Sequence, residues 1–516
     1  MIRISQATRC GVLSALVFSV VAAHAFAAAQ DARPDAVEVL VAIGGKADID
    51  RLTAAGFLVT NEHELVVSLA VTPEEITRLN ALGFTWWQPP AAGNQKDFVG
   101  YHNHAEITTD LQDYAAAYPA ITRLFNLGNS VQGRAIWAIL ITDNPDVQEE
   151  EPEFKYVGNI HGDEIVGLEN CMRLIDLLLN GYGSDTRLTN LVNDTEIWIV
   201  PSMNPDGLEA IRRFNASGVD LNRNFPAWPS TITGTYFDGA PFNDTGRPIE
   251  VQHIMRWSAE NSFVLSANLH GGAVVVNYPY DDDGGPSGEE APCPDDALMK
   301  VLARTYSIHN QPMWNSAVFA NGITNGAEWY VIDGGMQDWN YRYLGTIEMT
   351  IELSSIKRPN TSTLPQYWED NRESMLSYME AVHDGARGLV LDRATNAPLY
   401  AQVLVEGNTQ PVFTDPDVGD YYRLLLPGAY NLDISAPGYF TWREDGVVVP
   451  QDGYVRADVS LTDGDFNGDG AINATDLQLV INGVLGRPVE FDVDVDGRGV
   501  QATDVQKIVN RVLQGP

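Results

Sequence analysis

Strands and helices take turns along most of this chain, from Phe98 to Asp384. The clearest apolar runs are IWAILIT, KYVGNI, EIWIVPS, FVLSANLH and TIEMTIEL, and the longest helical run is EIVGLENCMRLIDLLL. A chain in which the two kinds of element alternate folds as an α/β domain around a largely parallel or mixed sheet. We therefore predict one α/β domain over residues 97–384, with helices on both faces of a mixed sheet.

The segments on either side of this domain differ from it in pattern. Residues 1–29 combine a basic start, a short apolar stretch and small residues, which predicts a secretory signal peptide and a secreted or extracytoplasmic protein. Residues 31–95 predict a small α+β unit from two apolar runs and two short helical patterns, with the role of a propeptide-like chaperone or inhibitor as a hypothesis. Residues 385–462 predict a small antiparallel β-sandwich, because short strands alternate there with Pro and Gly.

The charge of the chain excludes one class of partner and weakens another. Asp and Glu number 69 against 32 Lys and Arg, a formal charge of −37, which repels nucleic acids and anionic membranes. The one strongly apolar stretch, near the N-terminus, is too short to span a bilayer, so we expect no stable membrane insertion. Cys171 and Cys293 remain after signal removal and allow at most one disulfide.

Two histidines stand at the ends of apolar strands. His161 follows YVGNI with Glu164 three residues later, and His270 ends FVLSANLH before two glycines. Strands of an open α/β sheet present their carboxyl ends at one edge, where such side chains converge. A His, Glu, His set leaves one tetrahedral zinc position open for water, as in hydrolytic sites. Taken alone, Glu164 is equally explained by a favourable interaction with a helix N-terminus.

Six motifs follow one another in the order VPSMNPDG, DLNRNFP, LHGG, VVVNYPYD, NGAEWYVIDGGMQDWNY and TIEL. Together they resemble the zinc metallocarboxypeptidases, most of all the regulatory branch that includes carboxypeptidases D, E, M and N. The resemblance covers about residues 98–462, because that branch carries a transthyretin-like β-sandwich behind its catalytic domain. It implies one catalytic zinc and hydrolysis of the C-terminal peptide bond of peptides or proteins.

The resemblance also implies roles in catalysis. It assigns zinc to the two histidines and the glutamate named above, and it makes Glu352 the general base. Glu348 is the rival on the same strand, but it lies outside the motif. Arg213, rather than its neighbour Arg212, is expected to stabilise the oxyanion. Asp163 stands where the branch commonly has Asn, which leaves the ligands intact.

A further set of residues is implied to bind the substrate. Asn222 and Arg223 match the pair that holds the free C-terminal carboxylate, for which a planar guanidinium is suited. Tyr330 matches a tyrosine that closes over the substrate. Asp281 and Gln337 match the pocket that receives the terminal side chain, which favours release of Lys or Arg. Because Asp281 opens an acidic loop, a solvated carboxylate without a specificity role stays open as the alternative.

The segment 463–516 contains two similar acidic loops, each followed by an amphipathic helix. The repeat resembles a type I dockerin, which implies one or two calcium ions and a cohesin-type partner. In the first loop the expected oxygen ligands are Asp465, Asn467, Asp469, Asn473 and Asp476. In the second they are Asp492, Asp494, Asp496 and Asp504, but this loop is one residue longer and places Val500 where a polar ligand is expected.

The leading hypothesis is therefore a secreted zinc carboxypeptidase with a basic preference. Two alternatives stay open beside it. One is a zinc amidohydrolase or deacylase on the same fold, and the other is a catalytically silent binding or adhesion module. The dockerin-like segment adds docking into a cohesin-based or cell-surface assembly to any of these.

Overall fold

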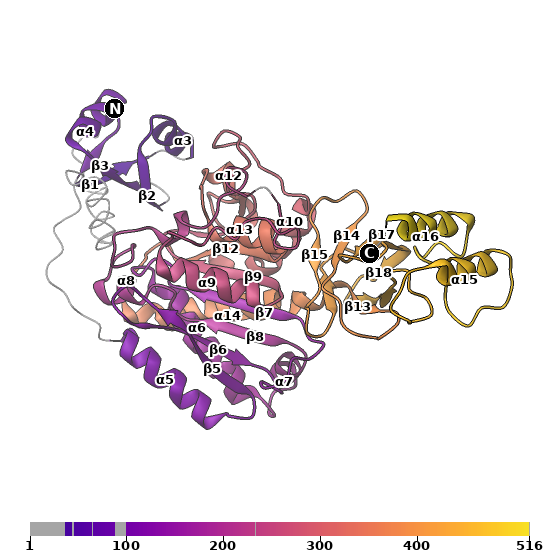
Figure 1. Cartoon of the computed structure of the whole chain (residues 1–516). Coiled ribbons are helices and arrows are strands. Elements are labelled where there is room, and N and C mark those ends of the chain that lie inside the picture. Colours follow the sequence, from indigo (N-terminus) through magenta and orange to yellow (C-terminus); the bar gives the residue numbers. More distant parts are fainter. Residues whose placement is uncertain (1–36, 44–45, 64–65, 88–99, 233, 515–516) are drawn as a thin grey trace, which may run out of the picture.

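The computed structural model describes residues 37–43, 46–63, 66–87, 100–232 and 234–514. The expected signal peptide, residues 1–29, lies outside the described residues. In Figure 1 the α/β domain fills the centre, and a β unit of residues 385–461 lies between it and a C-terminal helical module. Within the described ranges, no helix has the length and apolar character needed to cross a bilayer.

The α/β domain is built on one sheet with the strand order β11-β10-β12-β9-β7-β8-β6-β5. Its central strands β8, β7, β9 and β12 run parallel, whereas β10 pairs antiparallel with β12 and the edge pair β6 and β5 also runs antiparallel. The predicted mixed sheet is therefore confirmed. The strands are β5 (Thr122–Asn129), β6 (Ala135–Ile141), β7 (Glu153–Gly158), β8 (Glu196–Val200), β9 (Phe263–His270), β10 (Val274–Tyr278), β11 (Ile323–Asn325) and β12 (Ile347–Leu353).

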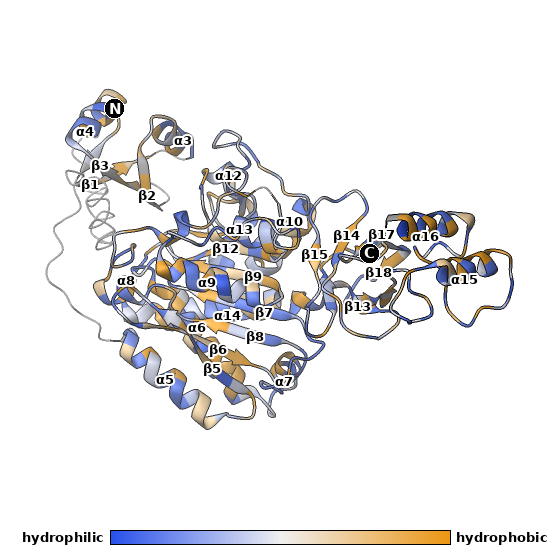
Figure 2. Cartoon of the chain, in the orientation of Figure 1, coloured by the Kyte–Doolittle hydropathy of each residue, from blue (hydrophilic) through white to orange (hydrophobic). Residues whose placement is uncertain are grey.

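Helices cover both faces of this sheet, and each face has its own apolar core. Every residue of β7, β8 and β9 is buried, including polar residues such as Lys155 and Asn268 among the apolar ones. Figure 2 shows apolar, orange segments in the central sheet and also in the helices around it and in the C-terminal module. One face packs against α5 (His104–Ala117), α6 (Ile165–Gly181), α7 (Thr186–Asn193), α10 (Asp296–Ser307) and α14 (Leu364–Glu380), and the other against α9 (Ile249–Glu260) and α13 (Met336–Trp339).

Short helical segments complete the domain between these elements. They are α8 (Pro205–Ala210), η1 (Leu221–Arg223), α11 (Gln311–Trp314), η2 (Ala320–Gly322), α12 (Gly326–Trp329), η3 (Asn340–Leu344), η4 (Thr361–Thr363) and η5 (Ala381–His383). Cys171 and Cys293 are both buried in this domain and are not bonded to each other.

The N-terminal unit is a four-stranded sheet with two helices. Its strands are β1 (Val37–Ala42), β2 (Leu58–His63), β3 (Val66–Val71) and β4 (Trp86–Trp87) in the order β2-β3-β1-β4, and its helices are α3 (Lys46–Ala54) and α4 (Pro73–Ala81). The apolar runs of the sequence predict β1 and β3 but not β2 and β4. The LVTNEH sequence of β2 ends in polar residues, and β4 is only two residues long.

The β unit consists of two sheets around one apolar core. Its antiparallel prediction is wrong in one respect, because β13 pairs parallel with both β19 and β20. These last strands return from the other sheet, so no hairpin sets their direction. The strands are β13 (Gly385–Asp392), β14 (Gln402–Val405), β15 (Val412–Phe413), β16 (Asp420–Arg423), β17 (Gly428–Ser435), β18 (Trp442–Val449), β19 (Tyr454–Arg456) and β20 (Val459–Leu461).

The C-terminal module contains two helices, α15 (Ala474–Val484) and α16 (Ala502–Gln514), which lie side by side. Each follows one acidic loop, as the repeat predicts. Phe466, Val480, Val493, Val495 and Ile508 form its small core.

Candidate active site at the carboxyl edge of the sheet

The sheet brings three strand ends together. Strands β7, β9 and β12 are parallel neighbours, so their carboxyl ends share one edge. His161 follows β7, His270 is the last residue of β9, and Glu352 of β12 lies in register with His270. Glu164 precedes the first residue of α6 at the same edge. The topology thus gathers four side chains that are far apart in the sequence.

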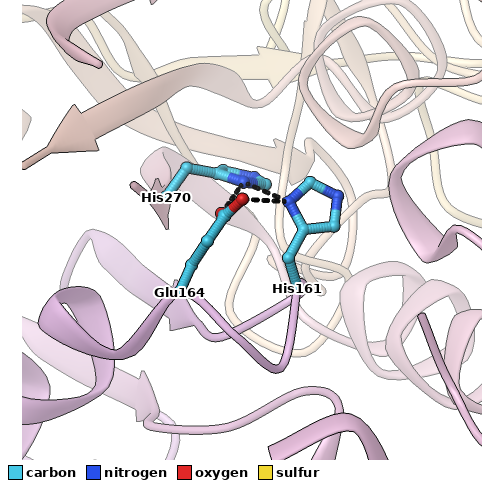
Figure 3. Close-up of side chains that lie close together, drawn as sticks. All are labelled: His161, Glu164 and His270. Atoms are coloured by element: carbon cyan, nitrogen blue, oxygen red, sulfur yellow. Dashed lines mark hydrogen bonds and ion pairs between the residues drawn. The ribbon is translucent and has the colours of Figure 1, made fainter. Parts of the chain in front are cut away.

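Three of these side chains point at one spot, as Figure 3 shows. The Nδ1 atoms of His161 and His270 are 3.0 Å apart, and they lie 2.9 Å and 2.8 Å from the two carboxylate oxygens of Glu164. Two ring nitrogens turned toward each other in this way can both bind a shared cation. The three side chains are nearly fully buried, and their nitrogen and oxygen donors fit zinc.

Two charged residues that the sequence analysis missed support the ligands from behind. Asp220 Oδ1 lies 3.1 Å from His161 Nε2, and Asp220 Oδ2 accepts a 2.8 Å hydrogen bond from Arg213 Nε. Burial by itself would raise the pKa of Asp220, but Arg213 and His161 hold it well below its usual range. Lys357 Nζ lies 3.2 Å from Glu164 Oε1. The sequence could have indicated Asp220, because it opens the DLNRNFP motif. It gives no comparable indication of Lys357, which only follows TIEL.

The two glutamates of β12 have different surroundings. Burial and the neighbouring charge of Glu164 raise the pKa of Glu352 to about 7. Among the described residues, none donates a hydrogen bond to Glu352 Oε2. Glu348, by contrast, accepts 2.7 Å hydrogen bonds from Ser266 Oγ and Asn340 Nδ2. Its carboxylate is therefore tied into the interior, and Glu352 is the one that faces the site.

Arg213, Arg223 and Tyr330 line a small cavity of about 30 Å³ together with Glu164 and Glu352. The cavity thus combines two guanidinium groups, a phenol and two carboxylates. Arg212 is outside this lining, on the turn where its backbone N–H donates to Gly207.

Asn222 lies beneath the second histidine. Its Nδ2 is 3.5 Å from His270 Nε2, and its Oδ1 accepts a 2.9 Å hydrogen bond from the backbone N–H of Met336. The amide is therefore fixed in orientation at the base of the site.

Asp281 and Gln337 meet behind the cavity. Gln337 Nε2 and Asn277 Nδ2 donate hydrogen bonds of 2.7 Å and 3.0 Å to Asp281 Oδ1. Asp281 is only 1% exposed, so it is not part of a solvated acidic loop. Burial raises the pKa of Asp281 to about 6 against the opposing effects of these hydrogen bonds and of Arg223.

The N-terminal unit touches the same region. Val59 of β2 lines the small cavity beside Glu352. Ile43, Lys46 and Ile49 line a neighbouring cavity of about 490 Å³, which shares Trp329 with the first. The unit therefore lies over the approach to His161, Glu164 and His270.

The two acidic loops are arranged differently. In the first, Asp465 accepts hydrogen bonds from the N–H groups of Gly468, Asp469 and Gly470, while Asn473 caps α15 and Asp476 accepts from the backbone N–H groups of Phe466 and Asn473. Asn467 Oδ1 accepts from the N–H of Asp469. In the second, carboxylate oxygens of Asp494, Asp496 and Asp504 lie within 4.8 Å of one another, and Asp492 is turned toward Arg393. Oxygen donors of this kind suit calcium.

Comparisons with known proteins agree with this geometry. A family described as "Zinc carboxypeptidase" matches residues 107–374, and one described as "Dockerin type I domain" matches residues 463–513. Carboxypeptidase D of Rattus norvegicus is 40% identical over 406 residues, which are 74% of this chain and 29% of the relative. The chain therefore spans less than a third of the length of that protein.

A shorter relative is matched over most of its length. The carboxypeptidase N catalytic chain of Mus musculus is 40% identical over 371 residues, which are 66% of this chain and 81% of the relative. Carboxypeptidase A from Helicoverpa armigera, a solved structure, superimposes with a TM-score of 0.52 at 17% identity, covering 67% of this chain and 96% of that one. This last comparison shows the fold.

Proposed function

Because this chain belongs to the zinc carboxypeptidase family, we propose that it is a secreted enzyme that hydrolyses the C-terminal peptide bond of peptides or proteins. One observation carries the proposal: three zinc-type donors, Glu352 and two guanidinium groups share one sheet edge. A silent binding module has no need for a complete set of this kind. An amidohydrolase has no evident use for Arg223 beside Arg213.

The catalytic roles follow from the positions of the side chains. When bound, zinc supplies Lewis acidity, which polarises a carbonyl and lowers the pKa of a water molecule. Glu352 takes the proton of the attacking water, because a carboxylate with a pKa near 7 accepts and returns a proton readily at neutral pH. The water oxygen bonds to the carbonyl carbon, the C–N bond breaks, and Glu352 passes the proton to the leaving amine.

The substrate roles are assigned by charge. Arg213 stabilises the oxyanion that forms on the carbonyl oxygen, because it is a fixed cation beside the site of attack. Arg223 holds the free carboxylate with Asn222, which explains exopeptidase action. Tyr330 closes the cavity over the bound C-terminus.

The proposed preference for Lys or Arg rests on Asp281. A buried carboxylate at the floor of a pocket gains a partner when a basic side chain enters, and Gln337 orients it. An acidic or apolar side chain would leave that charge unpaired.

Matched blocked dipeptides ending in Arg, Lys, Phe or Glu test the proposal, with bound zinc quantified in the same preparation. We expect cleavage of the Arg and Lys substrates, its loss on chelation and its return with zinc. A zinc-loaded protein that cleaves none of the four would favour a binding module or an amidohydrolase.

We further assign residues 97–384 to the catalytic domain, 385–462 to a transthyretin-like sandwich and 463–516 to a calcium-binding module for a cohesin-type partner. Residues 1–29 would direct export. Circular dichroism of the full chain is expected to change between calcium and chelator, because calcium ligation orders such loops. An unchanged spectrum would contradict calcium binding.

For the N-terminal unit, residues 31–95, we propose an inhibitory or chaperone role, because Val59 lies in the catalytic cavity. A shortened chain that starts at Asp97 is expected to cleave peptides faster if the unit inhibits, and to be obtained in lower yield if it assists folding. Equal activity, yield and stability would remove both roles.

A further inference from the structure

The second acidic loop lies directly on the β unit. Arg393, just after β13, donates hydrogen bonds from Nη1 to the carbonyl oxygens of Asp494 at 2.6 Å and Asp492 at 3.3 Å. The backbone N–H of Arg443 donates to the carbonyl oxygen of Asp496 at 2.9 Å. Three carbonyls from one loop thus meet donors on another unit.

The bond to Arg443 covers an open sheet edge. Strand β18 is the last strand in the order β15-β14-β17-β18, so one side of its backbone has no neighbouring strand in that sheet. Edge strands present N–H groups that need partners. The loop supplies one for Arg443, much as an added strand would.

Close packing accompanies these hydrogen bonds. A Cβ placed on Gly497 would lie 2.5 Å from the carbonyl oxygen of Arg443 and 2.7 Å from the ring of Trp442. At a second point, Arg511 of α16 donates to the carbonyl oxygen of Gly438, and Phe440 packs against the core of the module. The contact therefore combines hydrogen bonds with shape complementarity.

The first loop differs at the equivalent position. Gly468 donates its N–H to Asp465 as Gly497 does to Asp494, and its φ of +69° is close to the +77° of Gly497. No described atom lies within 4 Å of a Cβ placed on Gly468, so the two loops share their internal hydrogen bonds and differ in what surrounds this glycine. One repeat is thus docked at this glycine and the other is open.

We propose that the β unit is an intramolecular partner of the second calcium loop, so that calcium fastens the module to the enzyme and leaves the first loop open to another protein. The proposal rests on calcium binding by the module. Calcium bound by Asp494, Asp496 and Asp504 would displace the Lys507 ammonium that pairs with Asp496 and would fix the loop backbone. An ordered loop loses less conformational entropy when its carbonyls meet Arg393 and Arg443.

Hydrogen exchange of the full chain tests the proposal at the amide of Arg443, which bonds to the loop. With calcium, we expect this amide to exchange at least about tenfold more slowly than with chelator. Equal exchange in both conditions overturns the calcium dependence. Calorimetry in parallel measures calcium binding itself. If no calcium binds, the proposed calcium-binding function of the module fails, and not only the docking that depends on it.

Two pairs of variants isolate the contact. Gly497→Ala is expected to abolish the protection of Arg443, whereas Gly468→Ala, with similar backbone strain and no collision, is expected to keep it. Arg393→Ala is expected to reduce the protection, and Arg487→Ala, an exposed arginine of the module, is the control. Protection that survives both Gly497→Ala and Arg393→Ala in calcium would overturn the docking.

Discussion

Two places in this molecule bury carboxylates, and the pKa of Glu164 in the first is shifted in the opposite direction to the pKa values in the second. At the catalytic edge, Glu164 is buried, which by itself would raise its pKa. His161, Lys357 and His270 nevertheless hold the pKa of this carboxyl well below its usual range. These groups keep Glu164 ionised, whereas at Glu352 of the same edge burial and the charge of Glu164 outweigh the nearby cations.

The second place lies where the α/β domain meets the β unit, around a cavity of about 350 Å³. The described residues that line this cavity include no lysine or arginine. Burial raises the pKa of Asp420, which lines the cavity, to about 7. Glu196 pairs with the lining residue Glu153 on the neighbouring strand, and burial and the charge of Asp415 raise its pKa to about 7. Glu153 is 3% exposed, and its Oε2 accepts no hydrogen bond from a described residue.

In both places burial raises the pKa of the carboxyls, and the neighbouring charges decide the net direction of the shift. An ionised carboxylate in low dielectric is stable only beside a cation or a metal, and otherwise it takes up a proton. Glu164 is therefore held as an anion, whereas Glu352 at the same edge and the carboxyls between the α/β domain and the β unit keep their protons up to about neutral pH.

The largest expected effect comes from Glu352→Gln. Loss of the proton acceptor should lower the rate of hydrolysis by about 10²–10⁴-fold while bound zinc is retained, because the ligands are untouched. Glu153→Gln, where the α/β domain meets the β unit, is the matched control and should leave the rate unchanged. Steady-state kinetics with metal analysis check both variants, and a Glu352→Gln enzyme with normal turnover would contradict the assigned role.

Lys357→Met removes a cation from the catalytic edge, so that its buried carboxylates, like those between the α/β domain and the β unit, have one basic neighbour fewer. Removing this cation leaves Glu164 and Asp163 buried without it, which should lower the free energy of unfolding by about 3 kcal/mol. Adding Asp163→Asn should restore part of that loss, because one of the stranded charges goes as well. Denaturant titration of the two single variants and the double variant measures the coupling, and strict additivity would count against the pairing.

Asp281→Asn tests the substrate preference. The kcat/KM for Arg and Lys substrates should fall by about 30- to 1000-fold, and that for Phe should change little, because only basic side chains lose a charge partner. In the wild type, protonation of Asp281 below about pH 6 should weaken the same preference. An unchanged ratio of Arg to Phe cleavage, in the variant or across this pH range, would speak against Asp281.

Glu196→Gln should have the smallest effect, and it should be stabilising. Between pH 4.5 and about 7 the unfolded chain loses the proton of Glu196 while the folded chain keeps it, so wild-type stability falls as the pH rises. The variant lacks this loss and should gain on the order of 1–3 kcal/mol at pH 8, with little gain at pH 4. Thermal unfolding at both pH values measures this gain, with the exposed Glu289→Gln as control. An equal change in stability at pH 4 and pH 8 would contradict the prediction.

Much of the site could be predicted because strands buried on both faces have recognisable apolar sequences. His270 ends such a strand and His161 follows one, so the sequence alone predicts that the two side chains share one edge. Lys357 was missed because its partners Asp163 and Glu164 come from a distant segment. Asp220 was missed although its partner Arg213 is near in the sequence and its motif gave a signal. The parallel pairing of β13 with β19 and β20 was missed because strand direction depends on the path of the chain between sheets.

The short connection between the β unit and the module has a mechanical consequence. Only Thr462, Asp463 and Gly464 separate the end of β20 from the first acidic loop, and so short a segment gives the module little independent reach. A protein that binds the module would therefore hold the small cavity at a nearly fixed distance and orientation from itself. The peptide C-termini that lie at that distance would have the highest effective concentration at the cavity and would be the ones cleaved.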